Sequence, residues 1–203
     1  MMDKLFSKSK KAGNEQNYQT MREAALPVLH ITDSLLAETG NLLASFAEKK
    51  RFEGIVYWFG LEMEEKSVVT SLIVPDADTS WGCISTSPEA NAEVLRLIVG
   101  TPLILLGQAH SHPGNKVRHS DIDNRQTFAS FEGSISIVVP YFGKKGINLR
   151  RCGIHRHVSG SFKLISPKEI EKHLVVVPGN ADLRRSLSTY VDSENEEEKD
   201  DCK

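Results

Sequence analysis

This chain lacks the long hydrophobic runs, the cysteine framework and the basic excess that mark three large classes of protein. No stretch of 18 or more apolar residues occurs among its 203 residues, so we expect no transmembrane helix. The polar first 20 residues contain no secretory signal. Three cysteines, odd in number and widely spaced, exclude a disulfide scaffold and suit a reducing cytosol. A net charge of −2 argues against broad electrostatic binding to nucleic acid. These absences together predict a cytoplasmic protein that binds neither nucleic acid nor membrane.

The composition that remains is that of one ordinary globular domain with polar ends. Hydrophobic residues make up 39% of the chain and charged residues 26%, which is enough apolar material for a sizeable core. The polar start and the acidic end of the chain have little hydrophobic periodicity. We therefore expect a disordered N-terminal tail over 1–20, a single domain over 21–180 and a flexible acidic C-terminal tail over 181–203.

Helix and strand signals alternate through the domain. Thr32 or Asp33 can cap the first helix, and Ser87-Pro88 is a typical start for the second. The pattern predicts helices at 33–50, 88–99, 120–131 and 167–173, strands at 54–60, 68–74, 103–106, 135–139, 147–157, 161–165 and 174–177, and a loop at 76–86. The fold class is α/β or α+β, with a central sheet flanked by helices.

The most informative feature of the sequence is His110-Ser111-His112-Pro113, followed by Ser120, which seven residues separate from His112, and then by Asp123. Residues i and i+2 of a strand point to the same side, so His110 and His112 present two imidazoles to one point. Ser120 begins a helix, and Asp123 lies in its first turn, where it can face the histidines. Two imidazoles and one carboxylate are the ligand set of a catalytic zinc with a fourth position for water. Zinc suits these donors, and other divalent ions stay open.

An activated water needs a base, and Glu53 is the candidate. It lies between the first long helix and the first strand, whereas its rivals Glu38 and Glu48 are not followed directly by a strand. We expect Glu53 to take the proton of the water and pass it to a leaving amine. Ser120 can donate a hydrogen bond to the oxyanion of the tetrahedral intermediate and can also cap the helix. The reaction class is amide or isopeptide hydrolysis without a covalent intermediate.

These residues resemble the JAMM motif of the JAB/MPN metalloproteases. The match is His110-x-His112, seven residues, Ser120-x-x-Asp123, and the stretch from Glu53 to Gly60 is similar to the family's glutamate-to-glycine strand. Many members carry a further glycine where this chain has Val56, a difference that concerns packing rather than chemistry. The resemblance covers roughly residues 30–165. It implies a cytidine-deaminase-like three-layer fold and a zinc peptidase that cleaves after the C-terminal glycine of ubiquitin or a ubiquitin-like protein.

The compact segments at 76–86 and 142–153 make the chain more similar to bacterial JAMM peptidases than to the subunits of the eukaryotic proteasome lid. Those bacterial enzymes are encoded beside ubiquitin-like proteins, in antiphage operons among others. The resemblance therefore implies a ubiquitin-like substrate, and activating- and conjugating-enzyme-like proteins of the same operon as partners. Two alternatives stay open. One is a hydrolase acting on an adduct of a small sulfur-carrier protein, and the other is an inactive MPN scaffold.

Three further histidines receive ordinary assignments. His119 is interpreted as a loop residue. His155 and His157 form a second His-x-His pair, but Lys168 stands where the first motif has its aspartate, and a cation cannot ligate zinc. We therefore expect His155 and His157 to lie on the polar face of a strand.

Overall fold

The computed structural model describes residues 26–50, 52–80 and 83–179, and the predicted tails 1–20 and 181–203 lie outside these ranges. The helices and the short 3-10 helices are α2 (Asp33–Lys50), α3 (Pro88–Ile98), α4 (Asp121–Gln126), η1 (Pro140–Gly143), η2 (Leu149–Arg151) and η3 (Ile170–Lys172). The strands are β1 (Val28–Thr32), β2 (Ile55–Glu62), β3 (Lys66–Ile73), β4 (Asp78–Ser80), β5 (Cys83–Ser85), β6 (Ile104–Ser111), β7 (Ile135–Val139), β8 (Gly153–Val158), β9 (Ser161–Leu164) and β10 (Leu174–Val177).

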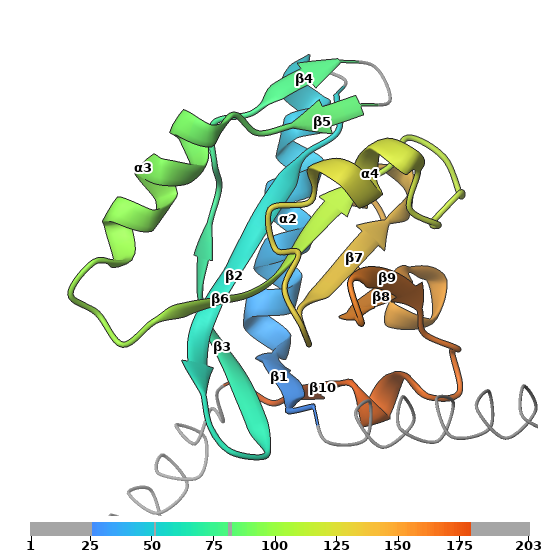
Figure 1. Cartoon of the computed structure of the whole chain (residues 1–203). Coiled ribbons are helices and arrows are strands. Elements are labelled where there is room, and N and C mark those ends of the chain that lie inside the picture. Colours follow the sequence, from blue (N-terminus) through green and yellow to red (C-terminus); the bar gives the residue numbers. More distant parts are fainter. Residues whose placement is uncertain (1–25, 51, 81–82, 180–203) are drawn as a thin grey trace, which may run out of the picture.

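A mixed, curled sheet forms the centre of the molecule (Figure 1). Its eight strands among the described residues follow the order β10-β1-β3-β2-β6-β7-β8-β9. β2 pairs antiparallel with β3 and β6, as the predicted hairpin requires, and β6 pairs parallel with β7. The expected α+β class with a central mixed sheet is confirmed.

Alternation along β2 explains why the helices cover both faces of the sheet. Val56 and Trp58 belong to the core cluster that includes Leu43 of α2, whereas Tyr57 belongs to a second cluster with Val94 of α3. Successive strand residues point to opposite faces of the sheet. A strand that is buried on both faces therefore has a continuous run of apolar residues in its sequence. The result is three layers, with α2 behind the sheet in Figure 1 and α3 on the other side.

Side-chain caps fix where the two long helices begin. Thr32 Oγ1 accepts a hydrogen bond from the Leu35 N–H at 3.2 Å, and Ser87 Oγ accepts from the Ala90 N–H at 3.1 Å. Both bonds satisfy amides that have no partner inside the helix. The predicted starts of these helices are confirmed.

Gly60 lies in β2 at a place where a side chain cannot fit. The pairing of β2 with β3 shifts register between Phe59 and Gly60, and a Cβ at Gly60 would lie 1.9 Å from the Val68 carbonyl oxygen. A glycine is therefore required by the close approach of the neighbouring backbone.

The structure corrects four predicted elements. The helix expected at 167–173 is only the 3-10 turn η3 (Ile170–Lys172). The loop expected at 76–86 contains the β4–β5 hairpin, whose three-residue strands are too short for a periodic signal. The 147–157 strand begins only at Gly153, because 149–151 form a 3-10 turn. The helix expected to reach residue 131 ends at Gln126, where Thr127 adopts extended backbone angles and its hydroxyl bonds the Asp123 carbonyl. None of the described helices combines the length and the hydrophobicity needed to span a bilayer.

Candidate metal centre

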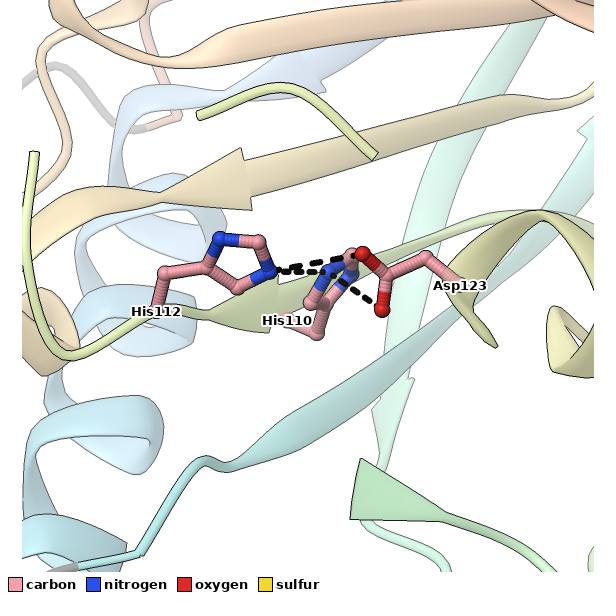
Figure 2. Close-up of side chains that lie close together, drawn as sticks. All are labelled: His110, His112 and Asp123. Carbon is pink, nitrogen blue, oxygen red and sulfur yellow. Dashed lines mark hydrogen bonds and ion pairs between the residues drawn. The ribbon is translucent and has the colours of Figure 1, made fainter. Parts of the chain in front are cut away.

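Strand β6 and helix α4 bring the two histidines and the aspartate of the motif together (Figure 2). His110 pairs with Ile55 of β2 on one side and Val138 of β7 on the other, so its strand is held in the middle of the sheet. His112 follows the strand, and its N–H donates to the Val139 carbonyl at 2.9 Å. The alternation expected for this strand thus places both imidazoles beside Asp123, as the sequence predicted.

The spacing of the three donor groups fits one tetrahedral ion. The two Nε2 atoms lie 3.2 Å apart. Nε2 of His110 lies 3.5 Å from Oδ1 of Asp123, and Nε2 of His112 lies 3.4 Å from the other carboxylate oxygen, Oδ2. Zinc bonds of about 2.0–2.1 Å at tetrahedral angles require ligand atoms about 3.3–3.4 Å apart. His110, His112 and Asp123 therefore form a donor set that fits a divalent metal in both chemistry and spacing.

The tautomer of His112 also suits a ligand. Its Nδ1–H donates to the Lys116 carbonyl oxygen at 2.8 Å, which leaves the Nε2 lone pair directed at the centre. Hydrogen bonding of the remote ring nitrogen is the usual way in which a protein orients a metal-binding imidazole. The loop that follows His112 thus orients its imidazole through the carbonyl of Lys116.

Electrostatics concentrate negative charge on the carboxylate. Burial alone would raise the pKa of Asp123, but its hydrogen bonds to His110 and His112 hold the pKa well below its usual range. Burial opposes charge on His112, yet the hydrogen bond to Asp123 and the nearby Glu53 raise the pKa of its imidazole. The centre therefore carries an ionised carboxylate, and a bound cation would take the place of the imidazole protons that this carboxylate attracts.

Ser120 and Asp123 build a capping box at the start of α4. Ser120 Oγ accepts from the Asp123 N–H at 3.1 Å, and the Ser120 N–H donates to Asp123 Oδ2 at 2.6 Å. These reciprocal bonds fix the side chain of Asp123 while it faces the histidines. The expected cap is confirmed, and the cap also orients the candidate ligand.

Glu53 lies buried beside this centre, with 3% of its surface exposed. The next residue, Gly54, is bonded to Ser111 through both its N–H and its carbonyl, so the carboxyl group is held near the histidine strand. Desolvation raises the pKa of Glu53 to about 7, against an attraction by His112 that lowers it and a repulsion by Asp123 that raises it. Its sequence rivals Glu38 and Glu48 are exposed on α2.

We expect the buried Glu53 to make the metal-free protein less stable as the pH rises. Its folded-state pKa of about 7 exceeds the ordinary value of 4.5, so its contribution to stability is present below pH 4.5 and is lost as the pH rises through 7. Glu53→Gln should raise the free energy of unfolding by roughly 2–3 kcal/mol above pH 7 and by nothing at low pH. Denaturant unfolding in a chelator at several pH values measures this, with the exposed Glu62→Gln as control. An equal difference at every pH would contradict it.

Two histidines outside the motif pack behind the centre, and the sequence interpretation missed them. His119 stacks on His155 with ring centroids 3.9 Å apart and lies 5.7 Å from the His110 ring. His155 is 3% exposed, so its assignment to a polar strand face is wrong. The reason is the sheet order: β8 lies beside β7, and its inward side chains meet the loop before α4. His157 packs edge-on against Phe162.

Comparison with known proteins gives related sequences and folds. No protein-family model matches the chain. A Sinorhizobium fredii protein named "Probable metalloprotease" is 29% identical over 108 residues, which are 51% of this chain. The aligned part spans 66% of that relative, just under two thirds of its length.

Two solved structures also match. A Desulfitobacterium hafniense protein solved in solution has a TM-score of 0.57 at 14% identity, over 74% of this chain and 94% of that one. A JAB1/MPN domain protein from Archaeoglobus fulgidus has a TM-score of 0.40 at 16% identity, over 74% of this chain and 99% of that one.

Proposed function

We propose that this chain, whose sequence resembles the JAMM motif of the JAB/MPN metalloproteases, is a zinc-dependent isopeptidase. Its substrate is the bond that follows the C-terminal glycine of ubiquitin or a ubiquitin-like protein. The observation that carries the proposal is the convergence of His110, His112 and Asp123 at tetrahedral spacing next to the buried Glu53. The rhizobial relative named as a probable metalloprotease supports the peptidase chemistry.

The residues of the chain divide the work of hydrolysis. His110, His112 and Asp123 would hold the metal, which when bound supplies Lewis-acid activation of water and of the scissile carbonyl. Glu53 takes the proton of the attacking water on its carboxylate and returns it to the leaving amine. Burial raises the pKa of Glu53 above that of an exposed glutamate, which makes its carboxylate a stronger base for this transfer.

Ser120 is placed to stabilise the oxyanion. Its oxygen accepts the capping bond from the Asp123 N–H, so the hydroxyl proton remains available to donate. Because the hydroxyl is fixed by the cap, it meets the developing charge without reorganisation.

Ser120→Ala should lower kcat by roughly 10²–10³-fold while metal remains bound. The same change removes the N-cap of α4, which costs about 1 kcal/mol of stability. The effect of losing the cap must therefore be distinguished from the effect of losing the oxyanion donor. Ser87→Ala removes the corresponding cap of α3 and should leave kcat unchanged. Steady-state kinetics and thermal unfolding of both variants measure this. If both variants lose activity equally, Ser120 acts only as a cap.

We propose that the substrate tail approaches the centre over the small hollow beside it. It is lined by Ile84 and Thr86 around the end of β5 and by Gln126 and Thr127 at the end of α4, with His110 and Asp123 at its base. The hairpin and α4 occupy the same end of the sheet in Figure 1. β5 pairs only with β4 among the described strands, so an extended tail can add to its other edge. The narrowness of the hollow favours glycine at the scissile bond.

A direct assay tests the function. The protein is incubated with a ubiquitin-like protein fused through its C-terminal glycine to a second domain, with and without a zinc chelator. We expect cleavage after the glycine that stops with chelator and returns with added zinc. Equal cleavage under both conditions, or none with any modifier encoded beside this protein, would rule out the proposal. The proposed partners are that modifier and its activating- and conjugating-enzyme-like proteins, in an antiphage system among other settings.

A further inference from the structure

His119 has no role in the proposed metal chemistry. Its side chain and backbone nevertheless contact α4 and the strands β7, β8 and β9 beside the centre. Its Nδ1–H donates to Asn124 Oδ1 of α4 at 3.0 Å, and its Nε2 accepts from the Ser136 hydroxyl of β7 at 2.9 Å. Its backbone N–H donates to Nε2 of His155 in β8 at 3.3 Å. Its ring also packs edge-on against Phe162 of β9.

These bonds exclude His119 as a ligand, because both ring nitrogens already have protein partners. Burial is the main cause that lowers the pKa of His119 to about 3, and the neighbouring histidines lower it further. The two hydrogen bonds are satisfied when Nδ1 of His119 donates and Nε2 accepts. A neutral imidazole with this pattern is a structural connector between α4 and the sheet.

Helix α4 needs such a connector. It is six residues long, and none of its residues is buried, so neither its length nor apolar packing can hold it in place. Its exit is tied to β6, since the Ala129 N–H bonds Gln108 Oε1 at 3.4 Å. At the start of α4, the capping box joins only residues of the helix end. His119 instead links α4 to the sheet, because it bonds Asn124 of α4 and Ser136 of β7.

We propose that His119 is a positioning residue that sets Asp123 against His110 and His112 so that the three can bind a metal. The inference rests on the proposed metal site, and it concerns metal affinity rather than the identity of the substrate. Loss of a partner behind a metal ligand typically weakens binding by about 10–100-fold. We expect a loss of that size when the link between His119 and Asn124 is broken.

The test measures binding of Zn²⁺ by chelator competition, and ligand geometry from the visible absorption of the Co²⁺-substituted protein. His119→Phe keeps a flat ring between His155 and Phe162 but removes both side-chain hydrogen bonds. His157→Phe is the matched control, because the His157 ring also packs on Phe162 and, among the described residues, no hydrogen bond or ring contact joins it to α4. We expect weaker zinc binding and an altered Co²⁺ spectrum for His119→Phe only.

Asn124→Ala provides a second variant that leaves the core intact, because Asn124 is exposed. It should weaken zinc binding in the same direction. The double variant should bind no more weakly than His119→Phe alone, since both changes break one link. Wild-type affinity and spectrum in both single variants, or no metal binding by the wild-type protein, would overturn the inference. Metal binding that depends on His119 in a protein that cleaves no modifier would support it and refute only the proposed function.

Discussion

Glu53→Gln lowers kcat by roughly 10²–10⁴-fold, and the protein keeps its metal. The amide has nearly the shape of the carboxyl group, so the packing around this buried side chain is retained. It has no basic oxygen of comparable strength, however, and cannot take a proton from water. Glu53 is not among the three residues whose donor atoms lie within 4.8 Å of one another, so we expect metal binding to persist without its carboxylate.

Kinetics and metal analysis of the same preparation check this expectation. Glu62→Gln is the matched control, because it makes the same substitution at the other, exposed end of β2. We expect the loss in kcat with KM little changed, since a base acts in the transition state. A Glu53→Gln enzyme with near-normal kcat would show that the base is another group, and one without metal would make Glu53 a ligand or its support.

The parts of the site that the sequence predicted are those governed by local rules. His110 and His112 share a side because a strand alternates, and Asp123 faces them because a capping box fixes the first turn of a helix. Ser120 sets the start of α4, because its capping bonds are made to Asp123, only three residues further along the chain. None of these inferences needs to know which strands are neighbours.

The parts that the sequence did not predict depend on sheet order. His155 lies 36 positions after His119 in the chain, and it reaches that ring only because β8 pairs with β7. A polar pair on a strand is ordinarily exposed, so the local pattern of His155 and His157 favoured the wrong face. The position of His119 was missed for the same reason, since its partners come from β7, β8 and α4.

The early end of α4 has a different cause. The helical signal continues beyond residue 126, but Thr127 bonds back to the Asp123 carbonyl and leaves the helix. The chain then turns so that the ring of Phe128 packs against Tyr57, with centroids 5.3 Å apart. Tertiary packing on β2 therefore decides the boundary, and Asp123 lies within one turn of both ends of this short helix.

Asp123→Asn should abolish activity and weaken metal binding by more than the roughly 10–100-fold cost of losing an outer partner. The amide oxygen can still accept from the Ser120 N–H, and the backbone bond to Ser120 Oγ does not involve the side chain. The substitution therefore removes the negative charge and leaves the cap, so the two roles of this residue are separated.

The neighbouring Asp121→Asn is the control for that experiment. Asp121 lies in the same first turn and is exposed, so its substitution makes the same change in net charge and the same change near the helix N-terminus. We expect Asp121→Asn to bind zinc and turn over substrate as the wild-type protein does, and Asp123→Asn to do neither. If both variants bind zinc equally well by competition titration, the charge at position 123 is not a ligand. His110 and His112 would then have to hold the ion with a donor from elsewhere, and the tetrahedral spacing of the three groups would have no role in binding.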